Sequence, residues 1–576
     1  MEDNQPESPS HGILDEQDDK IIIATFTCFT AFVLFVTFFI LATRFRLWHT
    51  NWLLEKIPKM VDNPVTYLIS ICAGLYAEVS YGNDLYWIWL MVLIIAYDNV
   101  LTISAGSTPG SSWLLREYVN LFYCIYLGFF INQDVMVSHE YHVPLLVLWS
   151  LLLAKFSLRL VFHKLVKRAY GLNNSKVVSD FMKIEHELAK PNENVDPQSM
   201  KGYNYLVLGE GKINPTMKGP EYTAEIKLPA DVVTLEKVWS CKERLLDPSM
   251  DTDNRLRDVC LSFAFFKLLK RRFFEYPAAE AQQEKTRQLV FDGLLKNLNK
   301  DNDSTRVYRV LAMEIGFIRD FFYTRYPIIF AFGFPVFQVI LLTGMLGVSL
   351  WISAIAFHRR EDSHNSYLKH NNHNIDYTIT NILLIIMSVM EALETMTYVF
   401  SDWTKVMLIC LCETHPVKDG GNTESIQPHY LVASQLSKYC AYLMVFLPDM
   451  LPDSIFSVKL FFREILSETK QFDGAHSLED KYNLMMQNVG GHGNGVIDMG
   501  VRLGRYLMEI PDDVCRWKIM AEFWSEFIIF LAPWGKVREH MRMLESGGEF
   551  ITHLWALLYH AGIVDHNTTA SSGYIP

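Results

Sequence analysis

The sequence predicts a mainly α-helical, polytopic membrane protein with about seven spans and two largely helical cytosolic domains. Half of the 576 residues are apolar, yet the chain carries a formal net charge of −12, so apolar and charged residues must occupy different parts of the chain. The apolar residues gather in runs of about 20, the length that crosses a bilayer as a helix. A chain of this length also exceeds one hydrophobic core, so several folded units are expected.

Seven apolar runs are the predicted spans, at residues 21–42, 65–82, 85–106, 118–131, 143–162, 326–357 and 377–400. The fourth run is short for a span. The sixth is long and contains Pro327 and Pro335, and proline interrupts or kinks a helix. Residues 326–357 could therefore form one span or two, and the total could change by one.

The spans divide the chain into five regions. They are an acidic extramembrane tail (1–20), a five-span membrane region (21–162), a cytosolic domain (163–325), a two-span membrane region (326–400) and a cytosolic helical C-terminal domain (401–576) with a terminal unit at about 505–565. Basic residues follow the first span (Arg44, Arg46, Lys56, Lys59) and the fifth (Lys164, Lys167, Arg168). Because cytosolic loops carry the excess of lysine and arginine, the N-terminus is predicted outside and both polar domains inside.

Composition argues against several functional classes. The acidic balance disfavours nucleic acid as a partner. The nine cysteines are scattered and form no CxxC pair, so neither a disulfide framework nor a zinc ribbon is predicted. The stretch GGHGNG lacks the GK[ST] ending of a phosphate-binding loop. We expect no cofactor and no metal.

The first cytosolic domain contains a short strand or turn element, MKGYNYLVLGEGK, and a predicted amphipathic helix, LRDVCLSFAFFKLLKRRFFE. Apolar residues recur at spacings of three and four in that helix, at Leu256, Val259, Cys260, Phe263 and Leu268. Its last turn carries Lys267, Lys270, Arg271 and Arg272. These cations are interpreted as a solvated helix end, with contact to anionic lipid as the alternative.

Ionisable residues inside the apolar spans are the most informative feature for function, because charges are costly there and need partners. Asp98, Lys155 and Glu391 are predicted at one depth of the membrane, and Arg159 and Glu394 one turn nearer the cytosol. One interpretation is that Lys155 and Arg159 extend to the interface. The alternatives are a buried cluster that fixes helix packing and a path for protons or ions.

Near the C-terminus, SGGEFITHLWALLYHAGI (546–563) places Glu549, His553 and His560 on one face of a predicted helix. These residue types can ligate zinc, but the spacing does not match the zinc-protease pattern. We interpret the three as structural. Gly547 and Gly548 are predicted to form a loop before the helix, Glu549 to offset the partial positive charge of its N-terminus and Gly562 to end it.

Several motifs in order resemble a plant membrane protein family. MKGYNYLVLGE, DVCLSFAFFKLLKRR and VYRVLAMEIGFIRDFFYTRYPII resemble domain of unknown function 4220. WKIMAEFWSEFIIFLAP and HMRMLESGGEFITHLWALLYHAGI resemble domain of unknown function 594, which usually follows it. The resemblance implies an integral membrane protein of land plants, abundant in grasses as large gene sets, and implies no catalytic or ligand residue. It also implies a recurring family pattern, in which GGE is followed by a helix that ends in H-x-G. This pattern is matched by Gly547, Gly548, Glu549, His560 and Gly562.

The leading functional hypothesis is a non-enzymatic membrane-anchored protein that interacts with other proteins through its cytosolic domains and with the lipid bilayer through its spans. A transporter or channel that uses the intramembrane charges is the alternative. A membrane-embedded enzyme comes third, suggested by histidines 358, 364, 370 and 373 and by the helix at 549–560. The sequence predicts a multi-pass membrane location and leaves open whether this is the plasma membrane or an endomembrane.

Overall fold

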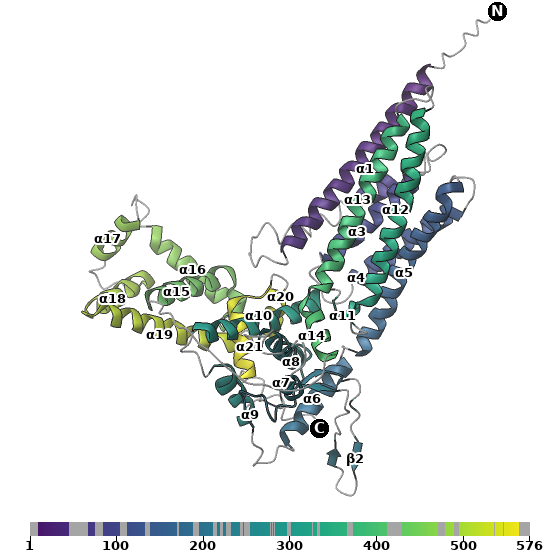
Figure 1. Ribbon diagram of the computed structural model, residues 1–576. Helices are drawn as coiled ribbons and strands as arrows, with labels where there is room; N and C mark the ends of the chain where they lie inside the picture. The colour runs from purple at the N-terminus through teal and green to yellow at the C-terminus, as the bar shows by residue number, and fades with distance from the viewer. Residues whose placement is uncertain are drawn as a thin grey trace, which may run out of the picture. The chain divides into compact units, whose positions relative to one another are not determined.

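The computed structural model of the chain (Figure 1) divides into two compact units. The first unit comprises Met1–Asn174 and Phe317–Cys412, and the second comprises Ser175–Gly316 and Glu413–Pro576. The structure describes residues 10–44, 67–74, 85–103, 112–132, 139–169, 172–187, 195–210, 213, 216–218, 223–225, 232–241, 246, 254–276, 278, 280, 283–295, 301–324, 326–330, 335–365, 372–411, 429–470, 478–488, 495–534, 536–544 and 547–563.

The first unit is a bundle of long helices that run side by side (Figure 1). They are α1 (Ser10–Arg44), α3 (Leu85–Ile103), α4 (Ser112–Asn132), α5 (His139–Ala169), α12 (Val336–Asn365) and α13 (Asn372–Val399), with the shorter α11 (Tyr326–Ile329) and α14 (Asp402–Leu411). Helix α3 contacts α1, α4, α5 and α13, and every residue from Leu85 to Val100 is buried. The almost wholly apolar α3 is therefore the centre of the bundle, as its composition requires.

Four described helices are long and apolar enough to cross a membrane, which indicates a membrane protein. These segments are Ile21–Phe39, Glu140–Val161, Val336–Arg359 and Asp376–Val399, which overlap the first, fifth, sixth and seventh predicted spans. Leu85–Val100, in the third, is a shorter apolar helix. The fourth lies within α4, and of the second only residues 67–74 are described, as a helix.

The structure refines two boundaries in the membrane region. Within 326–357, α11 is a single turn and α12 is one continuous helix that begins just after Pro335, where the missing N–H of proline is tolerated. Helix α1 begins at Ser10, inside the predicted acidic tail. Several predictions lie outside the described residues: Arg46, Lys56, Lys59, the first nine residues and most of GGHGNG.

The first stretch of the second unit surrounds helix α8. It contains α6 (Leu172–Glu187), α7 (Leu235–Ser240), α8 (Arg255–Phe273), α9 (Glu284–Gln288), a π-helical turn (Leu289–Leu294) and α10 (Asp301–Tyr323), whose last residues belong to the first unit. Strand β1 (Leu206–Leu208) pairs antiparallel with β4 (Val233–Thr234), and β2 (Thr216–Lys218) with β3 (Thr223–Glu225). The predicted strand or turn element thus contains β1.

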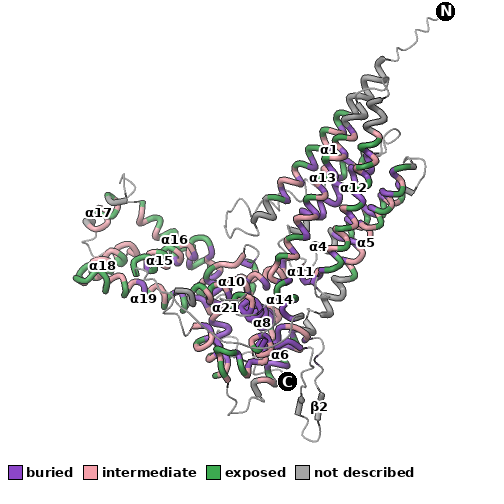
Figure 2. The backbone as a smooth tube through the Cα atoms, viewed as in Figure 1, coloured by how far each residue is buried: buried purple, intermediate pink, exposed green. Residues whose placement is uncertain are grey.

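The interpretation of α8 as amphipathic with a solvated end is wrong. The helix is buried on all sides from Arg257 to Arg271, which Figure 2 shows as a continuous buried stretch. Lys267 Nζ lies 2.5 Å from Glu210 Oε2, and Arg271 pairs with Glu280. The cations of its last turn therefore face internal carboxylates, and only Arg272 is half-buried.

The second stretch of this unit is helical. It contains α15 (His429–Phe446), α16 (Ile455–Thr469), α17 (Leu478–Asn488), α18 (Val496–Met508), α19 (Asp513–Leu531), α20 (Val537–Leu544) and α21 (Phe550–His560). Helix α15 packs along α19, and α16 contacts α18. The sequence predicted two separate polar domains, whereas the structure joins the two stretches in one compact unit.

Candidate functional sites: a buried charge cluster and the C-terminal helices

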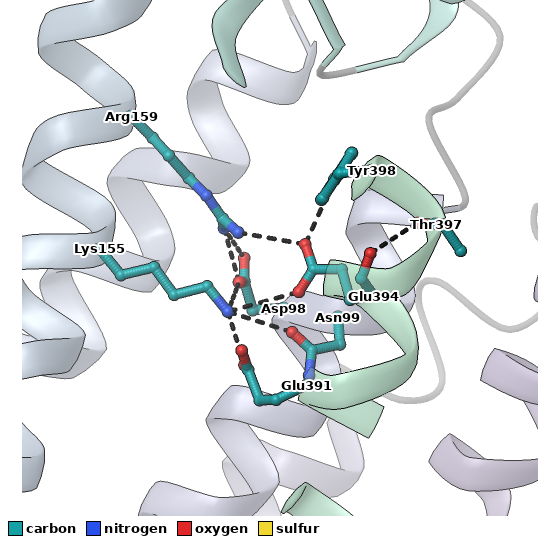
Figure 3. Close-up of polar contacts among 8 residues, drawn as sticks. All are labelled: Asp98, Asn99, Lys155, Arg159, Glu391, Glu394, Thr397 and Tyr398. Carbon is teal, nitrogen blue, oxygen red and sulfur yellow. Dashed lines mark hydrogen bonds and ion pairs between the residues drawn. The ribbon is translucent and has the colours of Figure 1, made fainter. Parts of the chain in front are cut away.

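Helical spacing brings the intramembrane charges together. Lys155 and Arg159 lie four residues apart on α5, and Glu391 and Glu394 lie three apart on α13, so each pair projects from one face of its helix. Asp98 and Asn99 come from the last turns of α3. Figure 3 shows the side chains from the three helices converging. We call these six residues the charge cluster.

Lys155 is at the centre of the charge cluster. Its Nζ lies 2.6 Å from Glu391 Oε1, 3.3 Å from Asp98 Oδ2 and 3.6 Å from Glu394 Oε2. It also donates a hydrogen bond to Asn99 Oδ1 at 3.2 Å. One ammonium group therefore connects α5 to both α3 and α13.

Arg159 makes the second set of contacts. Its Nη1 donates to Asp98 Oδ1 and Oδ2 at 2.7 and 2.6 Å, and its Nη2 lies 3.5 Å from Glu394 Oε1. The Tyr398 hydroxyl donates to the same Glu394 oxygen at 3.3 Å. Charge-assisted bonds of this kind are among the stronger polar contacts in proteins.

The structure brings together all five charged residues singled out from the sequence: Asp98, Lys155, Glu391, Arg159 and Glu394. The two predicted depth levels merge, because the closest cation to Asp98 is Arg159 from the other level. Arg159, the most exposed member, is only 6% exposed, so both cations point to acidic partners. Sequence reasoning missed Asn99 and Tyr398, although each follows a chosen acid, by one residue and by one helical turn.

The C-terminal motif forms a second polar centre, in the second unit. Glu549 immediately precedes α21, and its side chain makes no capping hydrogen bond to the helix. Its carboxylate instead accepts hydrogen bonds from Tyr442 at 3.1 Å and Tyr439 at 3.4 Å. Glu549 therefore lies at the helix N-terminus, where the sequence placed it, and its carboxylate also connects α21 to α15.

The two histidines of the motif have separate partners. His553 Nδ1 lies 2.8 Å from the backbone oxygen of Glu549, and its ring stacks on Tyr308. His560 Nε2 lies 2.6 Å from Glu314 Oε1, and its ring stacks on Phe265. Burial raises the pKa of Glu314, and His560 partly opposes that shift. The three predicted residues therefore diverge to different neighbours.

The described part of the chain contains no group of three or more His, Cys, Asp or Glu side chains placed to hold a metal ion. Among the four outer-loop histidines, His358 is exposed, and the side chains of the other three lie outside the described residues.

The glycines of the motif adopt the left-handed backbone region. Gly547, Gly548 and Gly562 have φ of +105°, +84° and +77°. Gly562 N donates to Tyr559 O at 3.0 Å and Ile563 N to Leu558 O at 2.8 Å, the paired bonds of a Schellman helix end. A Cβ on Gly548 would lie 2.8 Å from Ile315 Cγ2, so this glycine is needed for space as well as for conformation.

A third histidine supports the motif and was missed from the sequence. His540, on α20, is fully buried, its Nδ1 lies 3.1 Å from Thr552 Oγ1, and its ring stacks on Trp555. Burial lowers the pKa of His540 to about 3 and also lowers the pKa of His553. Both rings are therefore neutral parts of the packed interior at physiological pH.

The helices α15, α16, α18 and α19 expose large apolar side chains, and Figure 2 shows much of their length as exposed or intermediate. On α19 the spacing of four, four and three places Ile519, Phe523, Phe527 and Phe530 on one face. These four side chains, the apolar face of α19, are 41, 52, 37 and 59% exposed. The buried residues Ala521, Ile528 and Leu531 occupy the opposite side.

Two family models match the chain. One, described as a domain of unknown function (DUF4220), matches residues 57–447, and the other, described as a protein of unknown function (DUF594), matches residues 509–563. The predicted order of the two domains is confirmed. No curated protein and no solved structure matches the chain.

Proposed function

Since the chain belongs to the DUF4220 family, whose description assigns no activity, we propose a function from its surfaces: a multi-pass membrane protein whose second unit docks a partner protein. The proposal includes seven spans, an outside N-terminus and a cytosolic second unit. The four span-length apolar helices and the wholly buried α3 support a multi-pass bundle, and the basic residues after the first and fifth spans support the orientation.

The apolar face of α19 carries the docking proposal. Its four large side chains lie at helical spacing and are each more than a third exposed. Exposed large apolar side chains also occur on α16, at Phe456 and Leu460, and on α18, at Leu503. Contiguous apolar surface of this kind marks interaction sites, and a regularly spaced helical face suits a partner helix.

The charged residues beside this face indicate which kind of partner it binds. Exposed Glu522 and Glu526, one turn apart on α19, lie next to Phe523 and Phe527. These carboxylates disfavour an anionic lipid surface. A second copy of the same face would bring like charges together. We therefore assign the face to a partner protein that presents an amphipathic helix with basic residues along its apolar side.

Proximity labelling in cells tests this function. A promiscuous biotin ligase at the C-terminus would be compared among the wild type, Phe523→Ser with Phe527→Ser, Glu522→Lys with Glu526→Lys, and the control Val514→Ser. Val514 is 66% exposed on the same helix but lies away from the apolar face. We expect both paired variants to lose a set of neighbours that the control retains, with membrane insertion unchanged.

Three results would change the proposal. An identical neighbour set in all four chains would exclude docking at this face. Loss of neighbours in the serine variant alone would exclude a basic partner. Loss of self-association in that variant would assign the face to a second copy of the chain.

A transporter or channel is the second candidate, and the buried charge cluster is the observation that favours it. Ionisable groups at membrane depth often mark ion paths. Reconstituted vesicles would show a proton or ion flux that Asp98→Asn abolishes if this candidate holds.

A further inference from the structure

The charges of the cluster do not balance. Its carboxylates are those of Asp98, Glu391 and Glu394, and its cations are those of Lys155 and Arg159, with ion-pair distances of 2.6 to 3.6 Å. Buried Glu117 on α4 also acts electrostatically on Arg159. An uncompensated charge at such a buried position is costly.

The geometry shows which carboxylates are best stabilised as anions. Asp98 accepts from Arg159 through both oxygens and also lies 3.3 Å from Lys155. Glu391 and Glu394 lie one turn apart on α13. Glu391 contacts Lys155, and Glu394 lies near both Lys155 and Arg159. Two carboxylates that share a site do not both ionise readily.

Unsatisfied polar atoms lie in the same place. Among the described residues, Glu394 Oε2 and Asn99 Nδ2 are buried and have no hydrogen-bond partner, although Glu394 Oε2 lies 3.6 Å from Lys155 Nζ. Both atoms belong to side chains that point into the charge cluster (Figure 3). Buried polar groups are normally satisfied. The Glu394 oxygen is an acceptor that lacks a hydrogen, whereas Asn99 Nδ2 is a donor that lacks an acceptor.

We propose that the charge cluster is a proton-binding site, in which one exchangeable proton is shared by Glu391 and Glu394. The proton offsets the one carboxylate in excess within the charge cluster and supplies a hydrogen at Glu394. A metal cation is disfavoured as the ligand, because two fixed cations already lie within 3.6 Å of these carboxylates. The site belongs to the first unit and does not depend on partner docking by the second.

The proton also links the site to helix packing. Its loss would leave three carboxylates on α3 and α13 facing two cations on α5. Electrostatic repulsion between Asp98 and the two glutamates would then rise in a medium that screens charges poorly. Proton binding therefore favours the closed arrangement of α3, α5 and α13.

Infrared spectroscopy of the full chain in lipid nanodiscs tests the proposal, because a protonated carboxyl gives a carbonyl band that ionisation removes. Glu391→Gln and Glu394→Gln each leave one fewer carboxylate against the two cations. We expect each variant to lose one protonated-carboxyl band relative to the wild type. The control Glu140→Gln removes an acid that is 58% exposed and paired with Arg359 and should lose none.

The outcomes distinguish charge balance from other causes. Retention of the band in both glutamine variants would overturn the proposal. Its loss in only one would also overturn it, because a proton fixed on one glutamate by local burial is not shared. Reduced yield of a variant leaves the difference spectrum of its folded fraction informative.

A measurement on the wild type covers the case in which neither variant folds. The O–H of a buried carboxylic acid adds across a C=N bond of a hydrophobic carbodiimide, so that the oxygen bonds to carbon and the proton moves to nitrogen, and mass spectrometry locates the adduct. We expect one adduct per chain on the peptide with Glu391 and Glu394, formed more slowly at alkaline pH, and none on Asp98. No adduct on that peptide, or an adduct on Asp98 instead, would overturn the proposal.

Discussion

Arg159 Nη1 donates to both carboxylate oxygens of Asp98, at 2.7 and 2.6 Å, across 61 positions of the chain. This contact joins α5 to α3, the helix buried at the centre of the bundle. Lys155 lies farther from the same carboxylate, at 3.3 Å, and closer to Glu391. The charge cluster therefore contains two principal pairs, Arg159 with Asp98 and Lys155 with Glu391.

Asp98→Asn should deprive Arg159 of the carboxylate that accepts both of its hydrogen bonds and destabilise the folded chain by about 3 to 5 kcal/mol, the usual effect of removing one partner of a buried pair. Double-mutant cycles in detergent should give a coupling of about 1 to 3 kcal/mol between positions 98 and 159. The coupling between 98 and 155 should be smaller, because the distance is longer. Equal couplings, or strict additivity in both cycles, would contradict the two-pair arrangement.

Gly548→Ala should destabilise the C-terminal helices more than Gly547→Ala. Both positions have positive φ, which costs about 1 kcal/mol or more for a residue with a Cβ. Only at Gly548 would the new Cβ lie 2.8 Å from Ile315 Cγ2, whereas at Gly547 it meets nothing within 4 Å. The clash should add about 1 to 3 kcal/mol.

Chemical denaturation would measure the difference between the two glycine variants. Adding Ile315→Ala to Gly548→Ala should restore part of the stability lost to the clash. Equal effects of the two glycine substitutions would show that Ile315 moves aside without cost.

The packing around His540 should loosen in mild acid. Burial lowers the pKa of His540 to about 3 in the folded chain, whereas an unfolded histidine titrates near pH 6.5. Between those values only the unfolded chain binds the proton. The contribution of His540 to the free energy of unfolding is therefore fully present above about pH 6.5. It decreases as pH falls, by up to about 1.4 kcal/mol per pH unit. His553, whose pKa is also lowered by burial, acts in the same direction.

Hydrogen exchange of peptides covering 537–563 in the full chain would follow this loosening. His540→Gln should weaken the pH dependence, and His429→Gln, exposed at the start of α15, should leave it unchanged. If exchange below pH 6 increases no more in the wild type than in His540→Gln, the prediction is wrong.

Sequence reasoning succeeded where a rule along one helix decides the result. Counting residues from the ends of apolar runs placed Asp98, Lys155 and Glu391 at a common depth, and the structure brings them into contact. It could not show that Arg159 prefers Asp98, because lateral distances between helices do not follow from depth. The left-handed end at Gly562 was likewise predictable from local rules, whereas the approach of Ile315 to Gly548 joins residues more than 200 positions apart.

Local rules failed at α8 for the same reason. Lys267, Lys270 and Arg271 lie in a last helical turn, where cations are usually solvated. Their carboxylate partners, Glu210 and Glu280, belong to other elements, and only the tertiary fold decides that the helix is surrounded on all sides.

Lys270 and Lys267, one turn apart on α8 and both 1% exposed, should respond in opposite ways to replacement by methionine. Burial lowers the pKa of Lys270 to about 7, and Glu210 opposes the shift only in part while Lys267 adds to it. An unfolded lysine titrates near pH 10.4, so between these values the unfolded chain binds more protons. The stability contributed by Lys270 is therefore complete above about pH 10.4 and is lost as pH falls to 7.

Lys270→Met removes this penalty and should stabilise the chain by about 2 to 4 kcal/mol at pH 7, with a smaller gain at pH 10. Loss of the contact between its ammonium and the Phe266 ring, at 5.6 Å, reduces the gain slightly. Lys267→Met leaves Glu210 buried without the ammonium that lies 2.5 Å away, and it should cost about 3 to 5 kcal/mol. Denaturant unfolding of the full chain at the two pH values measures both effects, and a loss of stability in both variants at pH 7 would show that Lys270 is needed as a cation.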